Sequence, residues 1–276
     1  MTQRVILQGA AMAAMMCVAA AAGAQTAGRG AAPARGANGC AAMPNQAALR
    51  TALDKATAEE KSGLNNHMWA TLVDRDGVVC AIAFSGTDRF AQWPGSRVIS
   101  AQKASTAAAF SLDAGSNTAG SGQAKGLVLS TANLYSAVQP GGSLFGLQFS
   151  NPVDPAVAYR GPYAKYGTAT DPMDGFRVGG VNVFGGGLAV FGAEKKMLGG
   201  LGVSGDTSCA DHNIAWLIRK NLNLDHLAGV GGVSGDNDRP DNIVFDIDTA
   251  GKSKGGFGHP QCINIGNAAA LPAVQQ

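Results

Sequence analysis

The sequence has few aromatic residues and little net charge. Aromatic side chains make up 6% of the 276 residues, and the formal net charge is +2. Lysines and arginines are scattered rather than clustered into a stripe, so we expect no nucleic-acid partner. Beyond the N-terminal segment, no stretch of about twenty residues is apolar enough to span a bilayer. The length fits one large domain or two small ones.

Several catalytic and metal-binding motifs are also absent. The spacings H-x-x-x-H, C-x-x-C and H-E-x-x-H do not occur, which disfavours a dedicated zinc site. There is no G-x-S-x-G nucleophile elbow, and we interpret Ser204 as a turn-forming serine. A G-x-G-x-x-G pattern at 200–205 follows the second arm of a predicted hairpin, not the first strand of a βαβ unit, so it does not indicate a dinucleotide site. The acidic cluster at 236–241 lacks the EF-hand spacing.

The first residues indicate export. Arg4, an apolar run through Val18 and the sequence Ala22-Gly-Ala24 predict a signal peptide over 1–24. Met15 and Met16 occupy the positions before Cys17 and do not form a convincing lipobox, so we do not expect a lipoprotein. We expect a soluble periplasmic or secreted protein. Residues 25–39 are rich in Ala, Gly and Arg and predict a disordered linker. Residues 40–276 then form a single domain.

Removing the signal peptide leaves four cysteines, an even number that predicts two disulfides in an oxidising compartment. If a helix at 45–62 packs antiparallel to a strand at 68–74, its start lies beside the following turn. That geometry favours Cys40 with Cys80 and leaves Cys209 with Cys262, which would fasten the C-terminal tail over the last helix.

The candidate site lies within 179–216. We predict a strand, a turn at 194–196, a second strand, a glycine-rich bend at 199–205 and a helix capped by Ser208. Backbone amides should converge where the bend meets the helix N-terminus and suit a carboxylate or phosphate. The candidate ligand-binding residues there are Ser204, Gly205, Asp211 and His212.

Three further elements are expected upstream. A packing helix covers 44–62, and strands at 68–74 and 78–84 form a hairpin with a D-G turn in which Asp74 caps the turn. Ser96 should cap a helix with a face of small residues, and Lys103 lies off that face. Residues 113–177 form a long insert that contains all four tyrosines, and we expect a lid, a binding loop or an oligomer contact there. A tail follows at 225–276.

Three ordered motifs in these elements resemble the GlcG/HbpS family of haem-binding, haem-degrading (DUF336) proteins. The matching segments span 45–112 and 178–222. The residues that carry the resemblance are Val73, Asp74, Gly77, Lys103, Ala104, Ala107, the glycine-rich run at 199–205 and Asp211. The resemblance implies an α+β fold, with an antiparallel sheet of two hairpins and helices on one face in a profilin-like or roadblock-like order. It also implies that Lys103 points into a cavity and that the protein forms homo-oligomers.

Three functional hypotheses follow. In the first, the exported protein holds haem or a similar planar anionic ligand for transfer, storage or sensing, with His212 or His259 as metal ligands, because the Cys209 to Cys262 bridge would bring these histidines near each other. In the second, it is an enzyme acting on a carboxylated or aromatic metabolite, with Lys103, Asp211 and His212 as acid-base groups. In the third, it is an oligomeric scaffold.

Overall fold

The fold is built on one four-stranded antiparallel sheet. The structure, a computed structural model, describes residues 39–113, 126–264 and 271–276. The strands lie in the order β2-β1-β4-β3, with β1 at Trp69–Asp74, β2 at Val79–Phe84, β3 at Gly187–Phe191 and β4 at Met197–Ser204. Each hairpin joins neighbours in the chain, and β1 pairs with β4 between them. The α+β class and the sheet of two hairpins predicted from the sequence are confirmed.

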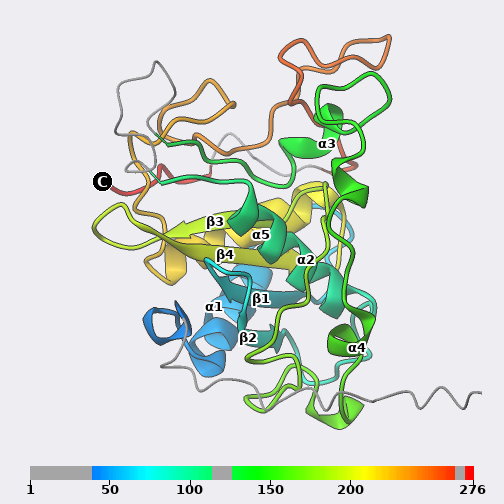
Figure 1. Ribbon diagram of the computed structural model, residues 1–276, viewed down its shortest axis with the longest axis vertical. Coiled ribbons are helices and arrows are strands. Elements are labelled where there is room, and N and C mark those ends of the chain that lie inside the picture. The colour runs from blue at the N-terminus through cyan, green and yellow to red at the C-terminus, as the bar shows by residue number, and fades with distance from the viewer. Residues whose placement is uncertain (1–38, 114–125, 265–270) are drawn as a thin grey trace, which may run out of the picture. The chain divides into compact units, whose positions relative to one another are not determined.

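The helices lie on both faces of the sheet, so the expectation that they share one face was wrong. Helix α2 (Ser96–Ala109) contacts β1, β3 and β4, whereas α1 (Gln46–Glu59) and α5 (Ser208–Asn221) contact each other and the sheet. Figure 1 shows α2 in front of the strands and α5 behind them. The physical reason is that both faces of β1, β3 and β4 are buried, and a sheet buried on both sides needs a cover on each.

Glycines in β4 explain how closely α2 approaches. The run at 199–205 is mostly strand rather than the expected bend. A Cβ on Gly200 would lie 2.1 Å from the Ala104 carbonyl oxygen, and one on Gly202 would lie 1.9 Å from the Ser100 carbonyl oxygen. The strand therefore requires glycine at these positions because the helix backbone rests directly on it.

The first hairpin and helix follow the sequence pattern. The Asp74 carboxylate accepts hydrogen bonds from the backbone N–H groups of Asp76 and Val78, both at 2.9 Å, and Gly77 has φ +76°. This is the turn-capping role expected for Asp74. Helix α1 starts after Asn45, whose side chain accepts from Ala48 N–H, and its buried face is the predicted set of Leu49, Ala52, Leu53 and Ala56.

The insert and the tail contain little regular structure. Within 113–177 the described residues form α3 (Leu134–Ala137), η3 (Leu147–Phe149), α4 (Pro155–Ala158) and η4 (Tyr163–Lys165); a further short turn, η2, covers Gly39–Ala42. Two buried ion pairs fasten these segments to the helices of the core. Arg97 of α2 pairs with Asp171 of the insert, and Arg219 of α5 pairs with Asp241 of the tail. Asp241 of the acidic cluster is thus paired with an arginine.

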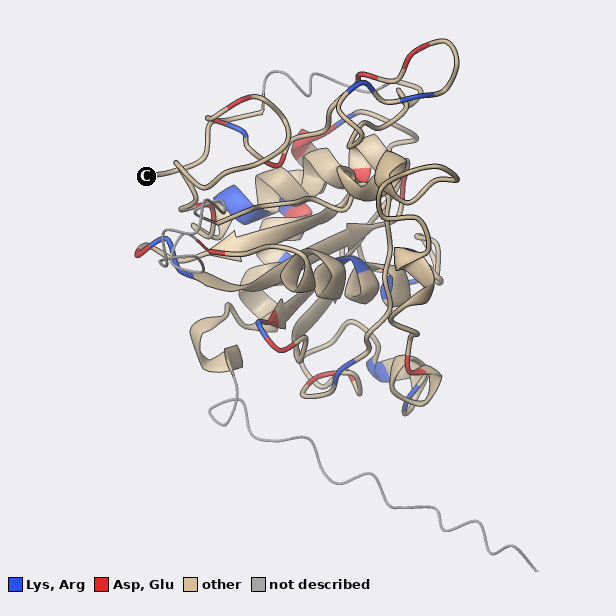
Figure 2. Ribbon diagram, turned by 45° about the horizontal axis from the view of Figure 1, so that its top comes forward, with Lys and Arg blue, Asp and Glu red and all other residues tan. Residues whose placement is uncertain are grey.

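Residues 1–38, which include the predicted signal peptide and nearly all of the predicted linker, lie outside the described residues. Among the helices that are described, none has the length and apolar character needed to cross a bilayer. In the view of Figure 2, basic and acidic residues are interspersed along the loops around the sheet.

Candidate functional site

The buried pair of Lys103 and Asp211 lies at the centre of the predicted site. The Nζ atom of Lys103 donates to Asp211 Oδ2 at 2.6 Å and to the Val203 carbonyl oxygen at 3.0 Å. Both side chains are 0% exposed. The other carboxylate oxygen accepts from the backbone N–H of Asp206 at 2.9 Å, and the ring of Phe184 lies 3.8 Å from Nζ. The pair therefore connects α2 to the start of α5 past the end of β4.

Burial dominates the electrostatics of this pair. It lowers the pKa of Lys103, against the attraction of Asp211. It also raises the pKa of the Asp211 carboxyl to about 6, although Lys103 and the Asp206 N–H both act to lower it. The attraction between the two charges thus offsets part of the cost of burying each of them away from water.

The start of α5 differs by one residue from the sequence expectation. Thr207 is the N-cap, and its side chain accepts from Ala210 N–H, while Ser208 is the first helical residue. The Ser208 hydroxyl instead accepts from the backbone N–H of Gly185 at 2.6 Å and bonds to His259 Nε2 at 2.7 Å. Both residues have cap-forming side chains, so the pattern alone does not separate them.

The two candidate metal ligands are buried. His212 is 0% exposed and His259 is 2% exposed. Desolvation lowers the pKa of His212 to about 3, against the attraction of Asp241, and neither of its ring nitrogens makes a hydrogen bond of good geometry. Desolvation also lowers the pKa of His259. Its Nδ1 bonds to the Pro260 carbonyl oxygen at 2.6 Å, so both its nitrogens are occupied.

The disulfides join Cys40 to Cys80 and Cys209 to Cys262, the same pairs that the sequence favoured. The second bridge holds His259 against the start of α5. Sulfur and imidazole ligand atoms of Cys209, Cys262 and His259 lie within 4.8 Å of one another. Because the thiolate is the form that binds metals, the cystine sulfurs are not available to an ion.

Other predicted site residues are placed differently. Ser204 is 2% exposed at the end of β4 and pairs in register with Trp69. A Cβ on Gly205 would lie 2.6 Å from the His67 carbonyl oxygen, so backbone packs closely against it. The structure thus brings Lys103, Asp211 and the end of β4 together in a filled corner. None of these residues lines the cavities at the surface that we describe.

A cavity of about 740 Å³ lies beside His259, between the insert and the tail. Tyr135 lines it, and the Tyr135 ring lies 5.1 Å from the His259 ring. Lys252 and Pro260 line it from the tail. Sequence reasoning named Tyr135 but missed Lys252, because nothing in a glycine-rich tail indicates which residues face the insert. The signal that could have located the cavity is the Cys209–Cys262 bridge.

The remaining insert tyrosines do not gather around one ligand. Tyr159 and Tyr163 are 68% and 67% exposed. Tyr166 lies under the guanidinium of Arg97, at 3.6 Å from the ring centroid. The four tyrosines are therefore close together in the sequence but do not cluster in the folded protein.

Comparison with protein families identifies the fold. Residues 45–220 match the family model described as "Haem degrading protein HbpS-like". The chain belongs to this HbpS-like family. The match covers the sheet and all but the last residue of the three long helices, and it includes nearly all of the two segments that carry the resemblance in the sequence.

Two solved structures are similar to part of the HbpS-like chain. One is the Klebsiella pneumoniae protein ORFY of the DUF336 family, with 25% identity, coverage of 65% of this chain and 90% of that chain, and a TM-score of 0.41. The other is a PduOC:heme complex, with 21% identity, coverage of 64% and 91%, and a TM-score of 0.40. No curated protein matches the chain. The family assignment depends on the family model alone.

Proposed function

We propose that this HbpS-like protein binds haem or a similar planar anionic ligand in the cavity beside His259. The observation that supports the proposal most directly is the size and lining of this cavity. Its volume of about 740 Å³ lies in the range of ligand pockets, roughly 300–1,000 Å³. The family description names haem, and that ligand fits the chemistry of the lining.

The lining offers two side chains that suit parts of a haem. Tyr135 presents an aromatic wall, and tyrosine is one of the side chains that hold haem iron in proteins. Lys252 places a cation at the cavity for a propionate. The His259 ring lies 5.1 Å from the Tyr135 ring, and His259 would need to leave Ser208 before it could bind a metal. When bound, haem would supply iron chemistry, while these residues would position it and neutralise its carboxylates.

The residues of the filled corner have a different role in this proposal. Lys103 and Asp211 hold α2 and α5 together, and His212 is buried at the start of α5; none of the three contacts the ligand. The corner residues named from the sequence then affect ligand binding only through stability. The enzyme alternative, with these three groups as acid and base, requires a substrate to reach side chains that are 0% exposed.

Titration of the mature protein with haemin tests the proposal. We expect a saturable Soret band, and Tyr135→Phe should change its position if the hydroxyl binds iron. Lys252→Ala should weaken binding by about 2–5-fold, as expected for one exposed charge pair. Lys254→Ala is the matched control, because this exposed lysine lies two residues along the tail and does not line the cavity.

Three outcomes separate the hypotheses. A band that responds to His259→Ala but not to Tyr135→Phe would identify His259 as the ligand. A haemin response that is unsaturable, or identical in all variants, would refute the cavity as the site. Turnover of a small carboxylated or aromatic metabolite without haem would favour the enzyme.

Export and self-association belong to the same proposal. The two disulfides support an exported protein, because such bonds persist in oxidising compartments. Phe145 and Phe149 of the insert are 61% and 77% exposed, which supports a subunit contact there. Cell fractionation and analytical ultracentrifugation, with Phe149→Ser as the variant, test these two points.

A further inference from the structure

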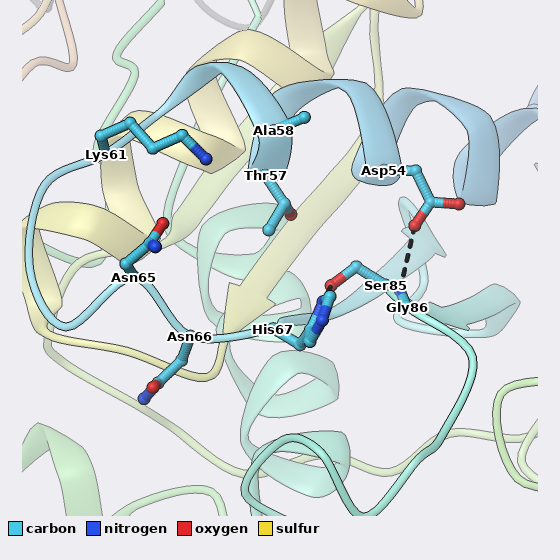
Figure 3. A pocket seen from close by; sticks show the side chains of 9 residues that line it. All are labelled: Asp54, Thr57, Ala58, Lys61, Asn65, Asn66, His67, Ser85 and Gly86. Atoms are coloured by element: carbon cyan, nitrogen blue, oxygen red, sulfur yellow. Dashed lines mark hydrogen bonds between the residues drawn. The ribbon is translucent and has the colours of Figure 1, made fainter.

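A second cavity lies against the C-terminal half of α1. Its volume is about 230 Å³. Three segments form its walls: α1, the loop at 60–67 and the end of β2 (Figure 3). The lining residues are Asp54, Thr57, Ala58, Lys61, Asn65, Asn66, His67, Ser85 and Gly86. None of them belongs to the filled corner or to the cavity beside His259.

The loop that forms one wall is held in place by the core. The carboxylate of Asp206, just after β4, accepts from the backbone N–H groups of Leu64 at 2.8 Å and Asn66 at 2.9 Å. The side-chain amide of Asn66 donates to the Gly205 carbonyl oxygen at 3.0 Å. The wall is therefore fixed before any ligand arrives, which reduces the entropy cost of binding.

His67 is oriented by hydrogen bonding and by packing. Ser85 Oγ accepts from the Met68 N–H at 2.8 Å, which leaves the hydroxyl proton to donate to His67 Nδ1 at 3.0 Å. This assignment puts the ring proton on Nε2 and makes that atom a donor. The ring rests on Gly86, where a Cβ would lie 2.8 Å from Cε1 of His67. Figure 3 shows the ring standing in the cavity below Thr57.

Thr57 and Lys61 provide two more donors, for which the described part of the chain shows no side-chain partner. The hydroxyl oxygen of Thr57 is buried and has no hydrogen bond among the described residues, an unfavourable arrangement for a polar group unless a partner arrives. Lys61 makes no salt bridge among the described residues, and Figure 3 shows its amine extended over the cavity. The one carboxylate of the lining, Asp54, is already paired with Arg50 at 2.7 Å.

We propose that this cavity is a binding site for a small carboxylate. The ligand carboxylate accepts from the Thr57 hydroxyl and from His67 Nε2, and it pairs with the Lys61 ammonium. Donors outnumber unpaired acceptors around the cavity, so an anionic acceptor group is the complementary partner. The ligand satisfies the Thr57 hydroxyl, which the protein leaves unsatisfied.

The volume limits the size of this ligand. A cavity of about 150 Å³ holds benzene, so about 230 Å³ has room for roughly ten non-hydrogen atoms. A tetrapyrrole is far too large, and the 740 Å³ cavity beside His259 is three times larger. The small site is therefore independent of the proposed haem site.

Titration of the mature protein with propionate, followed by amide chemical shifts, tests the site. We expect saturable shifts confined to the cavity lining, and no comparable shifts with propionamide, which has the same shape without the charge. Thr57→Val and Lys61→Ala should each weaken propionate binding by at least about fivefold, the equivalent of about 1 kcal/mol. Lys165→Ala, an exposed lysine on η4, is the control and should bind as the wild type does.

Stability of the ligand-free protein separates binding from structural roles. Because its hydroxyl has no partner, Thr57→Val should leave unfolding in propionate-free buffer unchanged or slightly more resistant to urea. Equal effects of propionate and propionamide, or unchanged affinity in Thr57→Val and Lys61→Ala, would overturn the proposal. Tighter binding of inorganic phosphate than of propionate at the same residues would overturn the carboxylate assignment.

Discussion

Replacing Lys103 by methionine should destabilise the protein strongly, because the Asp211 carboxylate would remain buried without its cation. Both side chains are 0% exposed. Removing one partner of a buried pair costs about 3–5 kcal/mol. The Val203 carbonyl oxygen also loses its donor, which places the loss toward the upper end of that range. A loss of about 5 kcal/mol lowers the melting temperature by about 10–20 °C in a domain of this size.

The loss should depend on pH in a defined direction. The pKa of Asp211 is raised to about 6 even with Lys103 present, and without that cation it rises further. Between these two folded-state values, the carboxyl of the variant binds a proton that the wild-type carboxyl does not. The deficit of Lys103→Met is therefore largest above the higher pKa and shrinks as the pH falls toward 6.

Urea unfolding with the disulfides intact, followed by circular dichroism at pH 8 and pH 6, measures both effects. Lys165→Met, at an exposed position, is the control. A Lys103→Met/Asp211→Leu double variant should lose less than the sum of the two single changes, because no unpaired charge remains. A free energy of unfolding for Lys103→Met within about 1 kcal/mol of the wild type at pH 8 would contradict this role of the pair. If Lys103→Met is as stable as the wild type but has lost turnover of a carboxylated or aromatic metabolite, the result would instead favour the acid-base role of Lys103.

Three further predictions concern the same core. The pKa of His212 is about 3 in the folded protein and 6.5 ordinarily. The stability of the wild type relative to His212→Gln should therefore fall by about 1.4 kcal/mol per pH unit below pH 6.5. The same pH dependence of the free energy of unfolding in urea for both proteins would contradict this prediction. Replacing Cys209 and Cys262 by serine should cost about 4 kcal/mol in guanidinium unfolding, from a sequence separation of 53, and an unchanged midpoint would argue against it. Gly202→Ala places a Cβ 1.9 Å from a carbonyl oxygen of α2 and should cost about 3 kcal/mol or more in thermal unfolding, whereas Gly95→Ala meets nothing within 4 Å and serves as the control.

Local chemistry made part of the fold predictable. The D-G turn with Asp74 determines the first hairpin, since the carboxylate needs only residues two and four positions away. The apolar face of α1 follows from its helical period alone. The cysteine pairs followed once the helix and hairpin were assigned, because these two elements determine which chain ends lie side by side.

Close packing made the rest unpredictable. The glycines of β4 indicate a bend when only the chain is considered, and their reason becomes visible only when α2 lies on the strand. Lys103 lies off the face of small residues and could equally have faced solvent. Its burial depends on Asp211, which is far away in the sequence. The cavity around Thr57 could not be predicted from the sequence either, because its walls come from three separate segments.

The attachment of the insert and the tail explains why a cavity can form between segments with little regular structure. Arg97 and Asp171 join the insert to α2, and Arg219 and Asp241 join the tail to α5, with all four side chains at most 2% exposed. A buried ion pair tolerates few geometries, because a shifted partner leaves a charge unpaired in an apolar site. Each long segment is thus fixed to a helix of the family fold by an ion pair. Tyr135 lies in the insert, so the cavity beside His259 depends on these attachments as much as on its own lining. An Arg219→Met variant should therefore lose the haemin response together with the order of the tail.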